Sequence, residues 1–325
     1  MQRRQFIVGT VGAAAWLFAG RAQPANPPVL GFLNGVAFAG PYAAALAAIR
    51  RGLEETGYVE GRNLAVEYRT ADGRYARLPE LAADLIRNRV AAIIVIGASI
   101  SELPLKLAAS IPIVFAMAPD AVEVGVLNGE APESDFAPAV TGAGAASKRL
   151  ELLFEMRPGA RLVAYLDNSR LSASFERNVE ILTSAVRAKS RELLVFDAGR
   201  DEEIETAFTR IALQRVRGLL IGPDPFLISR QQQIIALARE SGVPTIYATR
   251  GAAVSGGLMS YGVVTDEMYR LAGIYAGRIL QGAAPADFPV DLPTRFELVI
   301  NVRTAQALRI TVPRQLLIRA DEIIY

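Results

Sequence analysis

Short apolar runs alternate with helical segments along most of the chain, and this alternation limits the possible folds more than any other feature. The run from Ala91 to Ile96 is apolar at every position. Such a run is typical of a strand buried on both faces of a parallel sheet. In the first half we predict strands at Val29–Leu33, Leu64–Tyr68, Ala91–Ile96 and Ile111–Met117, and helices at Tyr42–Thr56, Arg74–Arg89 and Ser101–Ala109. The pattern predicts βαβ units in one doubly wound lobe.

A second series of the same kind follows a polar loop. Its predicted helices are Lys148–Met156, Ser172–Lys189, Glu202–Leu213 and Leu227–Ser241, and its predicted strands are Arg161–Leu166, Leu193–Phe196, Gly218–Ile221 and Pro244–Tyr247. The remaining pieces, a helix at Asp266–Gln281 and a strand at Phe296–Asn301, are too few for a third domain and complete the two lobes.

The predicted fold is therefore α/β, with two Rossmann-like lobes that have parallel sheets and are joined by a multi-strand hinge. We assign residues 1–22 to an export signal, residues 29–141 plus 263–283 to the first lobe, and residues 142–262 plus 284–325 to the second. A chain that crosses repeatedly between two lobes permits them to close on a cleft.

The glycine-rich segment after Tyr247 is the predicted crossing between the lobes. A loop carries Arg250, and Gly256-Gly257 opens a short extended run that ends at Gly262. Glycine allows the backbone a positive φ or a close approach to a neighbour, so this run suits a hinge or a ligand contact. An ordinary βα connection is the alternative interpretation, because glycine pairs mark many turns.

Composition excludes several classes of function. The chain has no cysteine and no histidine, which rules out thiol nucleophiles, disulfides, Cys/His zinc sites and imidazole bases. Lys plus Arg (35) nearly balances Asp plus Glu (33), and the basic residues are scattered, so we expect no nucleic-acid partner. No G-x-S-x-G elbow, dinucleotide fingerprint or phosphate-binding loop is present. We predict a protein that is not an enzyme and uses neither a cofactor nor a metal, with an exported enzyme as an alternative.

The first 22 residues have the layout of a bacterial export signal. Arg3-Arg4 precedes an apolar stretch from Phe6 to Ala19, and small residues at Gly20 and Ala22 predict cleavage before Gln23. The signal is of the Sec or the twin-arginine type, and it predicts a periplasmic protein. A membrane anchor is the alternative interpretation of this segment.

Polar residues follow most of the predicted strands, and ligands of open α/β sheets lie beyond the carboxyl ends of the strands. This rule selects Asn34, Ser99, Asp120, Asn168, Asp224 and Arg250 as candidate ligand-binding residues, and we add Phe226 and Tyr261 as aromatic side chains that can stack on a solute. An aspartate between a strand and a helix is equally typical of a helix N-cap. Asp120 and Asp224 therefore keep both interpretations.

Several segments resemble those of the ABC transporter substrate-binding family that includes tryptophan and tyrosine binders. They are Gly31–Asn34, Gly57–Asn63, Gly222–Phe226, Gly256–Gly262 and Phe296–Asn301. The resemblance implies a type I periplasmic-binding fold and implies ligand contact from Asn34, Ser99, Asp120, Asn168 and Asp224. The chain departs from the family pattern at Ala121 and Gly251, which leaves the identity of the ligand open.

The expected function is that of the periplasmic solute-binding component of an ABC importer. Its partners are then a small-molecule ligand, most simply an amino acid or an aromatic compound, and an inner-membrane permease. A periplasmic sensing module that signals through a membrane partner is the alternative.

Overall fold

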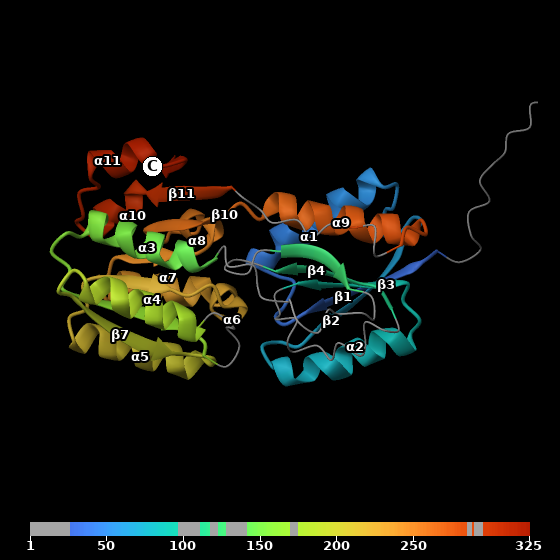
Figure 1. Cartoon of the computed structure of the whole chain (residues 1–325), viewed down its shortest axis with the longest axis horizontal. Helices are drawn as coiled ribbons and strands as arrows, with labels where there is room; N and C mark the ends of the chain where they lie inside the picture. The colour runs from blue at the N-terminus through green and yellow to red at the C-terminus, as the bar shows by residue number, and fades with distance from the viewer. Residues whose placement is uncertain are drawn as a thin grey trace, which may run out of the picture.

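The computed structural model of this 325-residue chain describes residues 27–96, 111–117, 123–127, 142–169, 175–284, 288 and 295–325. The predicted export signal and the predicted helix at Ser101–Ala109 lie outside these residues. The described part forms two lobes, each built on its own sheet (Figure 1).

The first lobe contains a five-stranded sheet in the order β2-β1-β3-β4-β5. Its strands are β1 (Val29–Asn34), β2 (Ala65–Thr70), β3 (Ala92–Ile96), β4 (Ile113–Met117) and β5 (Glu123–Leu127). The first four are parallel, which confirms the predicted βαβ series. Strand β5 was not predicted, and it pairs antiparallel with β4. Its sequence is interrupted by Glu123 and Gly125, whereas the prediction searched for continuous apolar runs.

Helices cover both faces of this sheet. Helix α1 (Pro41–Glu55) and helix α9 (Asp266–Leu280) lie on one face, and the short η1 (Tyr75–Arg77) and α2 (Leu78–Arg87) lie on the other (Figure 1). Pro41 occupies the first turn of α1, where its missing N–H costs nothing, and Gly57 leaves the helix with φ of 89°. Helix α9 directly follows a strand of the second lobe's sheet, so it ties distant parts of the chain together.

The second lobe contains a seven-stranded sheet in the order β12-β11-β10-β9-β8-β6-β7. Its strands are β6 (Leu162–Asp167), β7 (Glu192–Asp197), β8 (Leu219–Ile221), β9 (Thr245–Tyr247), β10 (Met259–Val263), β11 (Phe296–Asn301) and β12 (Glu322–Ile324). Only the β10–β11 pair among them is antiparallel. The predicted strands are confirmed, and β12 at the edge is an addition from the carboxyl-terminal tail.

The helices of this lobe divide between the two faces of its sheet. Helices α3 (Gly142–Met156), α4 (Phe175–Arg187), α10 (Val302–Ala307) and α11 (Arg314–Arg319) share one hydrophobic cluster, while α5 (Asp201–Leu213), α7 (Gln231–Glu240) and α8 (Arg250–Val254) contribute to the other. The short α6 (Pro225–Ser229) lies on the side that faces the first lobe (Figure 1).

The predicted helices were wrong in three places. Helix α3 begins at Gly142 rather than Lys148, because alanines between its early glycines supply helix-forming positions. The predicted helix at Leu227–Ser241 is two helices that meet at Arg230, whose ψ of 12° is not helical. Arg250 begins a helix of five residues instead of lying in a loop.

The glycine-rich segment after Tyr247 is a βα connection within the second lobe, because α8 links the parallel neighbours β9 and β10, and the chain crosses to the first lobe only at the end of this segment, after β10. Strand β10 belongs to the second sheet, whereas α9, which follows it directly, packs on the first. The backbone N–H of Val264 donates to the carbonyl oxygen of Arg295 (3.0 Å), so this crossing continues the β10–β11 ladder beside the returning chain. A Cβ atom at Gly262 would lie 1.8 Å from the carbonyl oxygen of Ala248, which explains the glycine there.

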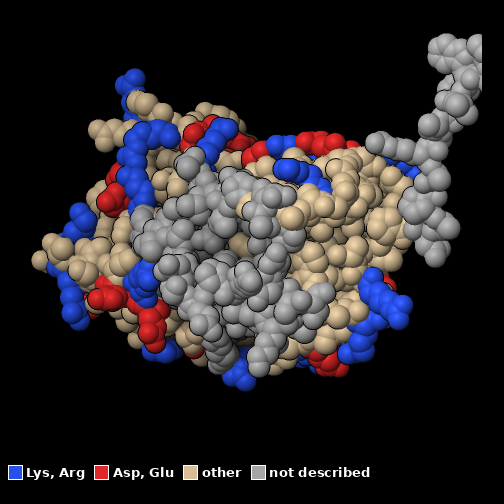
Figure 2. Space-filling model, turned by 45° about the vertical axis from the view of Figure 1, so that its right-hand side comes forward, with Lys and Arg blue, Asp and Glu red and all other residues tan. Residues whose placement is uncertain are grey.

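Basic and acidic side chains alternate on the described surface shown in Figure 2. Arg51 pairs with Asp266 (2.6 Å), and Lys148 pairs with Glu151 (2.9 Å). Among the described helices, none combines the length and apolar character that a bilayer span requires.

Candidate ligand-binding site between the lobes

Three parallel strands deliver buried polar side chains at their carboxyl ends. Asn34 ends β1 in the first lobe, Asn168 follows β6, and Asp224 lies three residues after β8 in the second lobe. Their exposed fractions are 0%, 1% and 2%. Burial of polar groups costs free energy unless they are hydrogen-bonded, so each of these three side chains requires hydrogen-bond partners.

Asp224 caps helix α6. Its Oδ1 atom accepts hydrogen bonds from the backbone N–H groups of Phe226 (2.9 Å) and Leu227 (3.2 Å), and Pro225 occupies the first turn. The cap interpretation of this residue is therefore confirmed. Its Oδ2 atom is buried and has no hydrogen bond of normal geometry with any described residue. The capping contacts fix the carboxylate and leave one acceptor oxygen unused.

Burial raises the pKa of Asp224 to about 6. The backbone N–H of Leu227, the side chain of Asn168 and the backbone N–H of Phe226 act in the opposite direction, because they favour the ionised form. The charge of Asp197 raises the pKa further. A neighbouring cation would restore the charged carboxylate, so this position suits an ammonium group.

Asp167, the last residue of β6, is fully buried directly before Asn168. Its Oδ2 atom accepts a hydrogen bond from the Tyr165 hydroxyl (2.5 Å), and Asn178 Nδ2 donates to the same hydroxyl (3.2 Å). A Cβ atom at Gly222 would lie 2.2 Å from the Asp167 carboxyl, so only glycine lets β8 pass this close. Our prediction ended the strand at Leu166 and missed Asp167. The alternation of Tyr165 and Asp167 on one face of the strand was the available signal.

Three buried tyrosines of the first lobe accompany Asp224. Tyr42 lies in the first turn of α1, Tyr75 in η1 and Tyr269 in the first turn of α9. Burial raises the pKa of Tyr42 well above its usual value, and the charges of Tyr269, Tyr75 and Asp224 raise it further. Helix α1 contacts α6 of the second lobe, so the charge of Asp224 acts on Tyr42 across the junction of the lobes. The sequence prediction placed none of these three tyrosines in the site.

Asn34 contributes a donor from the first lobe. Its Oδ1 atom accepts a hydrogen bond from the backbone N–H of Val36 (3.4 Å), whereas its buried Nδ2 atom has no partner among the described residues. An unpaired buried amide costs about 1–3 kcal/mol. The first lobe thus leaves a donor unused, and the second leaves the acceptor of Asp224 unused.

Phe226 is placed where the two lobes meet. Its ring is buried, the guanidinium carbon of Arg230 lies 5.1 Å from the ring centre, and a Cβ atom at Gly73 of the first lobe would lie 3.7 Å from the ring. Gly73 has φ of 78°. The ring therefore packs directly against the backbone of the first lobe.

Two of the predicted residues lie elsewhere. Arg250 forms a bidentate ion pair with Glu322 of the edge strand β12, with distances of 2.8 and 2.9 Å. Strand β12 is four strands away from β8 in the sheet, about 19 Å at the usual strand spacing. Tyr261 stacks on Phe296 in the β10–β11 ladder, with ring centres 5.5 Å apart. The structure does not bring either side chain together with Asp224.

Ser99 and Asp120 lie outside the described residues, and their roles stay predictions. Within the described ranges, no group of three acidic residues is arranged to hold a metal ion. The site assembled from described residues therefore consists of Asn34, Asn168, Asp224, Phe226 and the three tyrosines.

A family model described as ABC transporter substrate binding protein matches residues 40–324, nearly the whole chain. The chain belongs to this family. Among the relatives of this ABC transporter substrate-binding protein is the tyrosine-binding protein of Clostridioides difficile (strain R20291). The two are 21% identical over 258 residues, which cover 79% of this chain and 74% of the relative.

Solved structures of two similar proteins share the fold of this substrate-binding protein. The crystal structure of an ABC domain in complex with L-Trp from Streptococcus pneumoniae has a TM-score of 0.74 and 20% identity, and it covers 92% of this chain and 100% of that one. A conserved domain protein from Vibrio cholerae has a TM-score of 0.73 and 21% identity over the same shares. The predicted type I periplasmic-binding fold is confirmed.

Proposed function

We propose that this protein captures a small organic solute between its two lobes as the periplasmic component of an ABC importer. The observation that carries the proposal is the buried, unused Oδ2 atom of Asp224, which caps the helix whose Phe226 ring lies against Gly73 of the other lobe. A positively charged group is the partner that a buried carboxylate favours most. The solute therefore carries an ammonium group, as an amino acid does.

Aromatic side chains support an apolar or aromatic body for the same solute. Phe226 and Tyr42 belong to different lobes and are both buried near Asp224. Aromatic rings bind flat apolar groups through their faces and edges. The tyrosine-binding relative and the L-Trp complex of the Streptococcus pneumoniae protein support the same class of compound.

Lobe closure supplies the selectivity in this proposal. A solute that contacts Asp224 in one lobe and Asn34 in the other binds the closed form better than the open form, and it shifts the population toward closure. Ser99 and Asp120, which follow other strands of the first lobe in the sequence, complete the proposed site. Residues 1–22 support delivery to the periplasm, and a membrane permease is the partner that then receives the solute.

Asp224→Ala is expected to weaken solute binding at least tenfold, about 1.4 kcal/mol, because it removes the charged acceptor. A thermal-denaturation screen with amino acids and aromatic acids first identifies a compound that raises the melting temperature, since a ligand of the folded state stabilises it. Titration calorimetry then compares the variants. Asp266→Ala is the matched control, because Asp266 lies in the first turn of α9 and pairs with Arg51 at the surface. Equal affinity of Asp224→Ala and wild type would remove Asp224 from the site.

Arg250→Ala is expected to leave the affinity for the same compound within about twofold of wild type. The ion pair of Arg250 with Glu322 is half exposed, so its loss costs at most about 1 kcal/mol of stability. Calorimetry and a melting curve measure both quantities. A tenfold loss of affinity without unfolding would return Arg250 to the site, and its side chain would then have to leave Glu322 to contact the solute.

A further inference from the structure

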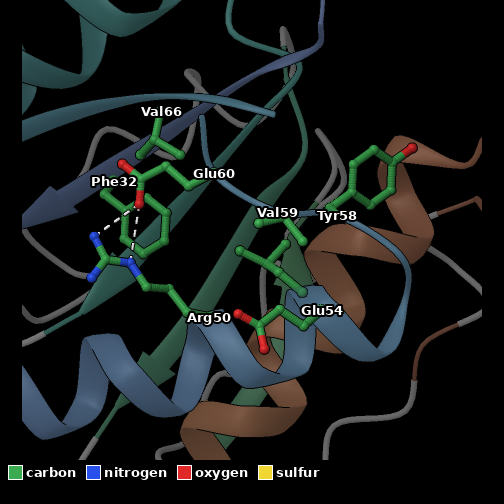
Figure 3. Close-up of a pocket in the computed structure, with 8 residues that line it drawn as sticks. Phe32, Arg50, Glu54, Tyr58, Val59, Glu60 and Val66 are labelled. Atoms are coloured by element: carbon green, nitrogen blue, oxygen red, sulfur yellow. Dashed lines mark hydrogen bonds and ion pairs between the residues drawn. The ribbon is translucent and has the colours of Figure 1, made fainter. Parts of the chain in front are cut away.

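A pocket lies within the first lobe, beside the last turns of α1 (Figure 3). It has a volume of about 290 Å³ and is bordered by the last turns of α1, by the loop that follows this helix, and by β1 and β2. This volume is at the lower end of the range for small-molecule sites, about 300–1,000 Å³. The Gly57–Asn63 segment, part of the resemblance to the family, forms its rim.

The pocket is separate from the proposed solute site. Tyr42, near Asp224, is in the first turn of α1, whereas Arg50 and Glu54 of the pocket are two to three turns further along the helix. At 1.5 Å per residue the separation along the helix axis is about 12–18 Å. One small molecule does not reach both places.

Two polar side chains of the lining, Arg50 and Glu60, are already paired with each other and with Tyr68. Arg50 Nη2 lies 2.8 Å from Glu60 Oε2 and donates to the Tyr68 hydroxyl (2.9 Å), and the same hydroxyl donates to Glu60 (2.9 Å). The two formal charges cancel, and each group has an oriented partner. The triad shapes one side of the pocket and leaves no net charge on it.

Glu54 carries the remaining charge. Its side chain borders the pocket from α1, is exposed, and forms no ion pair with any described residue. Figure 3 shows its carboxylate on the α1 side of the pocket, across from Val66. The lining therefore has one excess negative charge, which attracts a cation.

The interior of the pocket is apolar. Phe32 is almost completely buried and forms the floor, and Val59 and Val66 form the walls. Tyr68 continues this surface, because its ring centre lies 5.2 Å from that of Phe32. A compact hydrocarbon or aromatic group gains free energy by entering such a space.

We propose that this pocket is a second binding site, specific for an organic cation that combines a primary ammonium group with a compact apolar body. The apolar part lies against Phe32, Val59 and Val66, and the ammonium group lies at the rim beside Glu54. A carboxylate in place of the ammonium group is repelled by Glu54 and finds Arg50 already paired.

Titration calorimetry with 2-phenylethylamine tests the proposal, and 3-phenylpropionate is the probe of opposite charge. The amine is expected to bind the wild-type chain with a Kd of about 1 mM. Val66→Phe fills the pocket with a residue that strands accept and is expected to abolish binding. Glu54→Gln is expected to weaken binding about threefold, the effect of a partly exposed ion pair. Melting curves verify that both variants fold, and neither change affects solute capture between the lobes.

Asp224→Ala distinguishes the two sites, because it weakens binding between the lobes and leaves the pocket intact. Amine binding that survives in Asp224→Ala and disappears in Val66→Phe supports the proposal. The proposal is overturned if the amine binds Val66→Phe as well as wild type, or if Asp224→Ala abolishes its binding. It is equally overturned if no binding occurs up to about 10 mM, or if the propionate binds the pocket as well as the amine.

Discussion

Gly273→Ala is expected to lower the free energy of unfolding by about 3 kcal/mol, the upper end of the usual cost of overpacking. A Cβ atom at Gly273 in α9 would lie 2.1 Å from the carbonyl oxygen of Ile49 and 3.0 Å from the Cα atom of Gly52, both in α1. The atoms in the way belong to the backbone, so no side-chain rotation relieves the contact. The two helices have to separate.

The sign of this effect is informative. Alanine in place of an exposed glycine within a helix stabilises the protein by about 0.5–1 kcal/mol, because it restricts the unfolded chain. A loss at Gly273 therefore reports packing alone. Gly159→Ala, in the turn between α3 and β6, is the control, since no atom beyond its chain neighbours lies within 4 Å of a Cβ at that position. Urea unfolding curves supply the comparison, and equal midpoints for the two variants would show that α1 and α9 are not in close contact.

Ion pairs surround the same helix contact and do not replace it. Arg270 pairs with Glu55 of α1 (2.5 Å) and with Glu267 of its own helix (2.5 Å). These side chains are at least a quarter exposed, and surface pairs contribute at most about 1 kcal/mol each. The close approach at Gly52 and Gly273 is thus the stronger attachment of α9. Because α9 directly follows a crossing, this attachment also holds one end of the hinge.

The strands of both sheets were predictable because most of them are buried on both faces. Ala92 to Ile96 of β3 are all buried, which matches the apolar run in the sequence. The prediction missed two elements that are both short and only partly buried, β12 and α8. Strand β12 has three half-buried residues, and α8 has five residues, two of them buried. Such elements are fixed by contacts with the rest of the fold, which local sequence does not encode.

The rule on strand ends selected part of the candidate site and omitted the rest for a geometric reason. Asn34 and Asp224 have short side chains, so the position of the backbone determines where their polar atoms lie. Arg250 has a long side chain, and Glu322, 72 residues later in the chain, determines its direction. Tyr42 and Tyr75 lie on helical turns beyond the loops, where the rule was not applied. The ligand-binding roles of these residues stay predictions until a solute is identified.

Asp224→Asn is expected to stabilise the protein at pH 7 and to weaken solute binding at the same time. The pKa of Asp224 rises from 3.8 to about 6 on folding, chiefly through burial. The folded state therefore binds more protons than the unfolded state between these values, so stability is highest below pH 3.8 and decreases as the pH rises through 6. The cost above pH 6 is about 3 kcal/mol at 1.36 kcal/mol per unit. Asparagine does not ionise, yet its side-chain oxygen still caps α6.

Two measurements test both parts of this expectation. Urea unfolding between pH 4 and pH 7.5 should show that the free energy of unfolding of wild type decreases as the pH rises, and that this decrease is smaller in Asp224→Asn. At pH 7.5 the variant should have the higher urea midpoint. Calorimetry at pH 7.5 should show at least a tenfold loss of affinity for the solute found in the screen. A residue that costs stability when charged and is needed for binding when charged serves the ligand rather than the fold. If the variant is no more stable than wild type, the Asp224 carboxylate is already solvated or paired in the absence of a solute. The buried charge then does not contribute to the capture of an ammonium group.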